Sequence, residues 1–193
     1  MNAFEAGRTV EARGMAILSP FLMENATGYV VIDKGPLAKT LQETVGDVIF
    51  NSKRNGQLYS AEIKVEEKNE YGNFFLETWS NRNLKDIGSY LERGNNPGWF
   101  IKSRSRLLLY YFLREDDLYI IDMFKLKQWA FCTEQGRSGW PLMRYPEKRQ
   151  GKYDQLNDTW GCVAKIADVE RQVGFGRFNP KAVVENLRSG KAA

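Results

Sequence analysis

The stretch GDVIFNSKRNGQLYSAEIKVE, residues 46–66, decides the fold. Within it, 46–51 and 57–66 are rich in β-branched and aromatic residues, and the polar segment between them contains Asn55-Gly56. An Asn-Gly pair between two such runs is a strong β-hairpin signal, because both residues tolerate the positive φ angles of a tight turn. The stretch therefore predicts two antiparallel strands.

Side chains alternate between the two faces of a strand, and the second run follows that alternation. One face is apolar and is expected to lie against the core; it carries Tyr59, Ala61, Ile63 and Val65. The other face is polar and carries Ser60, Glu62, Lys64 and Glu66. Asp47 opens the partner strand, so the hairpin is expected to bring Asp47 close to Glu62 where the strands splay at their ends.

Asp47, Glu62 and Lys64 together suit hydrolysis assisted by a divalent cation. Mg²⁺ prefers oxygen ligands, keeps several waters, and needs only one or two carboxylates together with a substrate phosphate. Asp47, Glu62 and the backbone carbonyl of Ile63 are the expected metal ligands. The Lys64 ammonium, on the same face, is expected to orient the attacking water and to stabilise developing negative charge.

The rest of the chain predicts an α/β protein with a mixed β-sheet flanked by helices. Helices are expected at 2–24, where Pro20 interrupts or ends the pattern, and at 124–131 and 179–188; strands are expected at 28–33, 73–80, 117–123 and 160–167. Residues 99–113 are interpreted as a helix or mixed segment, and 133–158 as mostly loop. We expect one domain over 1–193, with a core at about 1–130 and an elaboration at about 133–193.

Composition narrows the class of function. The chain has no histidine, which excludes Ser-His-Asp triads, histidine-based nucleases and nearly every zinc site. Cys132 and Cys162 lie far apart without a CxxC spacing, which is typical of a reduced intracellular protein. No secretory profile or long apolar run is visible, so we expect a cytoplasmic protein that does not span a membrane.

A formal net charge of +4 is compatible with a polyanionic partner. Three basic residues precede the dense apolar run 107–113 and are candidates for binding DNA phosphates: Lys102, Arg104 and Arg106. A solvated, charged helix end explains the same three residues equally well.

The D…ExK arrangement of Asp47 with Glu62-Ile63-Lys64 resembles the PD-(D/E)XK nuclease superfamily, whose core is a helix, a run of strands, a helix and a strand. The resemblance implies a restriction-endonuclease-like core and Mg²⁺ dependence, with Mn²⁺ able to substitute. The proline usual before the aspartate is Gly46 here. The superfamily often adds an acidic residue from the first helix, and Glu11 is the choice for it, with Glu5 as the alternative.

The resemblance covers roughly residues 1–130. Within this range, the stretches YGNFFLETWSN (71–81), PGWF (97–100), LLLYYFL (107–113) and DLYIID (117–122) also look like small phage-encoded nucleases of the same superfamily. A second ExK match, Glu66-Glu67-Lys68, falls where the strand is running out. The expected function is a Mg²⁺-dependent DNA endonuclease or junction resolvase; resolvases of this type act as dimers, so a homodimer is also expected. The alternative is a non-catalytic DNA-binding or protein-binding inhibitor on the same scaffold. An RNA-binding domain has only charge and aromatic content in its favour.

Overall fold

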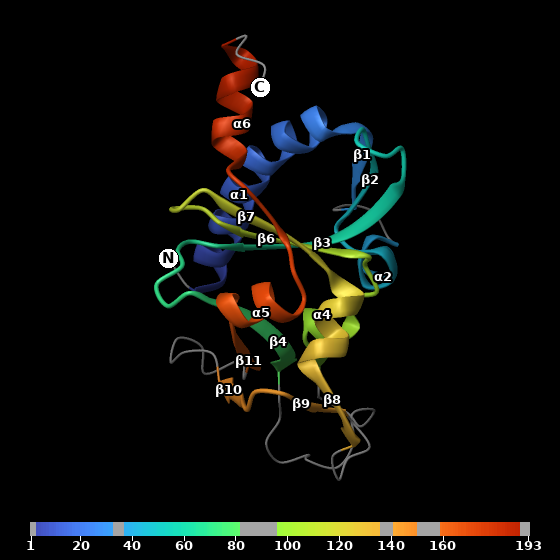
Figure 1. Cartoon of the computed structure of the whole chain (residues 1–193), viewed down its shortest axis with the longest axis vertical. Helices are drawn as coiled ribbons and strands as arrows, with labels where there is room; N and C mark the ends of the chain where they lie inside the picture. Colours follow the sequence, from blue (N-terminus) through green and yellow to red (C-terminus); the bar gives the residue numbers. More distant parts are fainter. Residues whose placement is uncertain (1–2, 33–36, 82–95, 136–140, 150–158, 190–193) are drawn as a thin grey trace. The chain divides into compact units, whose positions relative to one another are not determined.

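The computed structural model describes residues 3–32, 37–81, 96–135, 141–149 and 159–189. The chain forms two compact units, and Figure 1 shows the elements of both. The first comprises Met1–Glu70, Arg104–Met123 and Phe175–Ala193; the second comprises Tyr71–Ser103 and Phe124–Gly174. The expected single domain, with its core at 1–130 and its elaboration at 133–193, stays a prediction.

The first unit is built on a six-stranded sheet of order β1-β2-β3-β6-β7-β12. β3 and β6 are parallel, and the other neighbouring strands in this sheet are antiparallel. The elements of the unit are α1 (Ala3–Asn25), β1 (Ala26–Val31), α2 (Ala38–Val45), β2 (Val48–Ser52), β3 (Leu58–Glu66), β6 (Leu107–Phe112), β7 (Asp117–Asp122), β12 (Gly176–Phe178) and α6 (Pro180–Arg188). The protein is therefore an α/β protein with a mixed sheet flanked by helices, as expected.

Helix α1 supplies much of the core of this unit. Leu18, Phe21 and Leu22 are at most 3% exposed and belong to one buried cluster with Val48 of β2 and Ile63 of β3. Their spacing of three and four residues places them on one side of the helix. Complete burial of a Leu or Phe side chain contributes roughly 1.5–3 kcal/mol, so this contact fixes β2 and β3 against the helix.

β2 and β3 form the predicted hairpin, in which Val48 pairs with Ala61. Gly56 in the turn has a φ of 66°, the positive value that the Asn-Gly signal anticipates. Along β3, Ala61 and Ile63 are 0% and 5% exposed. The apolar face predicted from the alternation is therefore the face that packs into the core with α1.

Two elements differ from the sequence-based expectation. Pro20 lies inside α1, which continues to Asn25, so the proline neither ends nor divides the helix. Residues 99–113, interpreted as a helix or mixed segment, contain only the short helix α3 (Trp99–Lys102), and 107–112 form the strand β6. The run LLLYYF in β6 is almost entirely buried. A strand buried on both faces loses the polar alternation by which strands are recognised, so its sequence resembles a buried helix.

A polar cluster fastens β12 and α6 to the β6–β7 hairpin. The Arg177 guanidinium donates to both carboxylate oxygens of Asp117, at 2.9 Å from Nε and 2.6 Å from Nη2. Asp116 accepts hydrogen bonds from the Tyr111 hydroxyl at 2.7 Å and from the Lys181 backbone N–H at 3.1 Å. These bonds attach the carboxy-terminal segment to the sheet of the first unit.

The second unit contains a four-stranded sheet of order β10-β11-β4-β5 and the strand pair β8–β9. The remaining elements are β4 (Asn73–Asn81), β5 (Asn96–Pro97), α4 (Met123–Ala130), β8 (Phe131–Gln135), β9 (Pro141–Met143), β10 (Glu147–Arg149), β11 (Trp160–Lys165) and α5 (Ile166–Gln172). β9 and β10 lie in the stretch that was interpreted as mostly loop. The sequence did not predict them because three-residue strands are too short to show alternation. No helix in the described part of the chain is long and apolar enough to cross a membrane.

Candidate active site

A glycine at the entry to β2 sets the position of Asp47. Gly46 has a φ of +92°, a conformation that L side chains rarely adopt. A Cβ at this position would lie 2.1 Å from the Ser105 hydroxyl oxygen and 2.5 Å from the Ala61 carbonyl oxygen. Proline, whose ring fixes φ at about −65°, cannot adopt this conformation, so the backbone at this position explains why no proline precedes Asp47.

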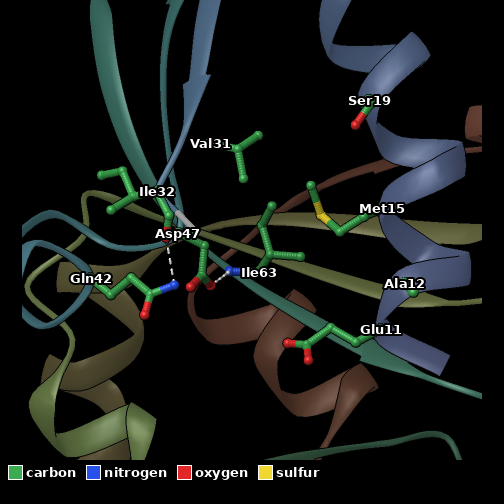
Figure 2. Close-up of a pocket in the computed structure, with 9 residues that line it drawn as sticks. All are labelled: Glu11, Ala12, Met15, Ser19, Val31, Ile32, Gln42, Asp47 and Ile63. Atoms are coloured by element: carbon green, nitrogen blue, oxygen red, sulfur yellow. Dashed lines mark hydrogen bonds between the residues drawn. The ribbon is translucent and has the colours of Figure 1, made fainter. Parts of the chain in front are cut away.

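Hydrogen bonds hold Asp47 against β3 and against Ile32, the residue that follows β1; the side-chain bond to Ile63 is drawn in Figure 2. The Asp47 backbone N–H donates to the Ala61 carbonyl at 2.8 Å, and its own carbonyl accepts from the Ile32 N–H at 2.8 Å. Its side-chain Oδ2 accepts from the Ile63 N–H at 2.8 Å. Ala61 and Ile63 immediately flank Glu62. The structure thus places Asp47 directly beside the tripeptide 62–64.

The pKa of the Asp47 carboxyl group is raised above its ordinary value of 3.8. Burial is the largest cause, because it removes water from the charged form. The hydrogen bond from Ile63 lowers the pKa, the nearby Glu11 carboxylate raises it, and the Lys64 ammonium lowers it. The balance means that the site disfavours an isolated negative charge on Asp47.

Two of the predicted site residues, Glu11 and Lys64, act electrostatically on Asp47 from different elements. Glu11 extends from α1 toward the strands (Figure 2). Glu62 and Lys64 are half-buried, and alternation along β3 directs them away from the core face that holds Ala61. Asp47, the residue before β2, is therefore influenced by a carboxylate on α1 and by an ammonium on β3, whereas Glu62 is not among the groups that shift its pKa. Glu5 lies in α1 as well, but its side chain is outside the described part of the structure.

The Asp47 region suits a divalent cation. Oδ1 of Asp47 accepts no hydrogen bond from any residue that the structure describes, and burial leaves the charge of the carboxylate poorly compensated. No three acidic or cysteine side chains among the described residues form a complete metal site. Mg²⁺ needs no such group, since it retains waters and binds one or two carboxylates together with substrate phosphates. The residues present are compatible with that requirement.

Lys64 differs from the lysine of the second ExK match. Lys64 is half-buried and makes no ion pair or hydrogen bond with any residue in the described ranges. Lys68 is paired with Glu70, and Glu67 is paired with Arg13 at 2.8 Å. The second match is therefore occupied by surface ion pairs, whereas the Lys64 ammonium still has hydrogen bonds to donate.

The three basic residues named as candidates for phosphate binding fall in different settings. Lys102 belongs to α3 in the second unit. Arg106 pairs with Asp122 at 2.8 Å in the first unit. Arg104 is exposed and makes no ion pair with any residue that the structure describes. Arg104 is thus the freest of the three to bind a phosphate.

The segment 104–106 lies beside the residues that lead into Asp47. The Ser105 hydroxyl donates to the Val45 carbonyl at 3.3 Å, and the Arg106 backbone N–H donates to the Ser60 hydroxyl at 3.1 Å. Sequence reasoning did not identify Ser105, which is only 4% exposed. Its position directly between two arginines gave no local signal that its hydroxyl would bind the end of α2.

Ser19 is a second residue that the sequence analysis did not single out. It lies on α1 and lines the same pocket as Glu11 and Asp47. A serine four residues after Met15 and between apolar helix positions was the available signal, because a polar residue in an apolar stripe often faces a cavity or a partner. Gln42 lines this pocket too, with its Nε2 donating to the Ile32 carbonyl at 2.6 Å.

Comparisons with protein-family models, with curated proteins and with solved structures gave no match to this chain.

Proposed function

We propose that this chain is a Mg²⁺-dependent nuclease that hydrolyses phosphodiester bonds in DNA. The observation that carries the proposal is the position of Asp47, whose side chain binds the Ile63 N–H within the ExK tripeptide and is influenced by Lys64 and Glu11. In addition, helix α1 precedes the antiparallel strands β1, β2 and β3, and β3 pairs in parallel with β6. This arrangement supports the helix and the run of strands that the resemblance implies, whereas the only helix between β3 and β6 in the described residues is the four-residue α3 of the second unit.

Asp47, Glu62 and the Ile63 carbonyl would hold the cation. When bound, Mg²⁺ supplies electrostatic polarisation of the scissile phosphate. Lys64 donates hydrogen bonds to the attacking water and to the phosphate oxygens as their negative charge grows. Glu11, approaching from α1, accepts a hydrogen bond from a water at the edge of the site. The attacking water releases one proton to solvent as the new P–O bond forms, the P–O bond to the leaving sugar oxygen breaks, and the leaving oxygen takes up one proton from solvent.

The experiment is a cleavage assay with purified protein on supercoiled plasmid and on branched DNA, in Mg²⁺, in Mn²⁺ and in EDTA. Cleavage is expected with either metal and not in EDTA. Lys64→Met removes the ammonium but keeps its apolar length, so the rate should fall by about 10²–10³-fold, the usual effect of losing one group that stabilises transition-state charge.

Lys68→Met is the matched control, because it makes the same change four residues away in the second ExK match. Its rate should equal that of the unmodified protein. Cleavage that persists in EDTA, or equal rates for the two lysine variants, would rule out the proposed site. A protein that cleaves no DNA, yet binds DNA or one protein partner tightly, would favour the non-catalytic alternative.

A further inference from the structure

A pocket opens beside Asp47, between α1 and the strands of the first unit. Its volume is about 500 Å³. Figure 2 shows Met15 pointing from α1 and Ile63 from β3 into the same space, with Val31 of β1 above them. Asp47 and Ile63 belong both to this pocket and to the site proposed to bind the metal. A group that occupies the pocket therefore lies next to Asp47.

The lining has apolar walls and polar ends. Met15, Val31 and Ile63 form apolar walls, while the carboxylates of Glu11 and Asp47 lie toward one end. The Ser19 hydroxyl, further along α1, makes no hydrogen bond with any residue in the described part of the chain. Pockets that hold small organic groups have this character: roughly 300–1,000 Å³, mostly apolar, with a few polar groups that fix orientation.

A single nucleobase fits this description better than the other parts of DNA. A base has apolar faces and a polar edge, whereas the sugar-phosphate backbone carries a charge that apolar walls would exclude. A base that is stacked in a duplex cannot enter a pocket between a helix and a sheet; it must first leave the stack. Extrusion is least costly for a base that is already unpaired.

We propose that the pocket accepts one unpaired nucleotide next to the cleaved phosphate, so that the preferred substrate is DNA with an unpaired base at a flap, gap or branch point. This inference rests on the proposed nuclease function. The base lies against the partly buried side chains of Met15 and Val31, and its polar edge is recognised by Ser19. Fully paired duplex is then a poor substrate, because each turnover must first unstack a base.

The test compares cleavage rates in Mg²⁺ on a paired duplex and on the same duplex with one unpaired nucleotide. The unpaired substrate should be cleaved at least tenfold faster. Ala12→Leu places bulk at the pocket lining and should remove that preference. Ala16→Leu makes the same change one helical turn along α1, at a residue that does not line this pocket, and should leave the preference intact.

A second measurement does not depend on turnover. The fluorescence of 2-aminopurine, placed as the unpaired base, should change when the Lys64→Met protein binds, and the change should be lost when Ala12→Leu is added. Equal cleavage of both DNAs, or a preference that survives Ala12→Leu, overturns the pocket assignment and leaves the nuclease proposal standing. Absence of cleavage on every DNA removes both proposals together.

Discussion

Asp47 and Asp117 are carboxylates at strand ends of the same sheet, and their environments are opposite. Asp117 is 6% exposed, yet both of its oxygens are satisfied by the Arg177 guanidinium. Asp47 receives one side-chain hydrogen bond from the described residues, and a second carboxylate, Glu11, lies near enough to raise its pKa. The first arrangement is complete without a ligand, whereas in the second one carboxylate oxygen accepts no hydrogen bond from the described residues. This difference separates a structural carboxylate from a candidate ligand-binding one.

The largest expected effect comes from Asp47→Asn, which removes the charge but keeps an oxygen that can accept from Ile63. Cleavage should fall by about 10³-fold or more, because a bound metal supplies several kcal/mol of charge stabilisation and each 1.36 kcal/mol is worth about a factor of ten. Initial rates on plasmid DNA in Mg²⁺ measure the loss. A variant that retains most of its activity would remove Asp47 from the metal site.

Although Asp47→Asn should reduce the cleavage rate, it should increase the thermal stability of the protein in EDTA. The folded state raises the pKa of Asp47 above the unfolded value of 3.8, so its stability contribution is most favourable below pH 3.8 and is lost as the pH rises through the folded pKa. Asp47→Asn removes that loss, and its Tm at neutral pH should exceed that of the unmodified protein. Thermal melts across this pH range test the sign. A lower Tm for the variant at neutral pH would contradict the raised pKa of Asp47.

Gly46→Ala should perturb the Asp47 region alone and leave Asp117 in place. A non-glycine residue at the φ of Gly46 costs about 1–3 kcal/mol, and the new Cβ would also collide with Ser105 and Ala61. Both the free energy of unfolding and the cleavage rate are expected to fall. Gly56→Ala is the control: its φ is also positive, at +66°, but its Cβ would meet no atom within 4 Å. Equal losses for the two variants would show that close packing around Gly46 is unimportant.

Asp117→Asn should lower the stability of the protein and leave its cleavage rate unchanged, the opposite of what is expected for Asp47→Asn. Removing one partner of a buried ion pair costs about 3–5 kcal/mol, and we expect the lower part of that range or slightly less because the Arg177 side chain is 59% exposed. Urea denaturation measures the loss, and the cleavage rate at a temperature where the variant is folded should be unchanged. Glu67→Gln, which breaks the exposed pair with Arg13, should cost at most about 1 kcal/mol.

The smallest expected effect is on DNA binding and concerns two arginines, Arg104 and Arg106. Arg104 makes no ion pair within the described ranges, whereas Arg106 is held by Asp122. Arg104→Ala should therefore weaken DNA binding more than Arg106→Ala and should reduce the slope of log affinity against log salt by about 1. Fluorescence anisotropy at several salt concentrations gives both quantities. A larger effect at Arg106 would show that its ion pair with Asp122 opens on DNA.

Much of the fold could be predicted because its signals are local. The hairpin of β2 and β3 follows from Asn55-Gly56 and from alternation, which depend on backbone preferences within a few residues. β6 was missed as a strand because burial on both faces removes the polar alternation. Its parallel pairing with β3 could not be read at all, since roughly forty residues separate the two strands and the pairing is fixed by tertiary contacts rather than by local preference.

By itself the sequence determined an α/β class, the β2–β3 hairpin and the presence of Asp47, Glu62 and Lys64 at suitable spacing. Only the tertiary structure decided that Asp47 binds the Ile63 N–H, that Gly46 must be glycine beside Ser105, and that Glu11 influences the Asp47 charge. The position of a residue along a strand determines the face of the sheet on which its side chain lies. Electrostatic free energies depend instead on distance and burial, and those quantities arise only when segments distant in sequence pack together.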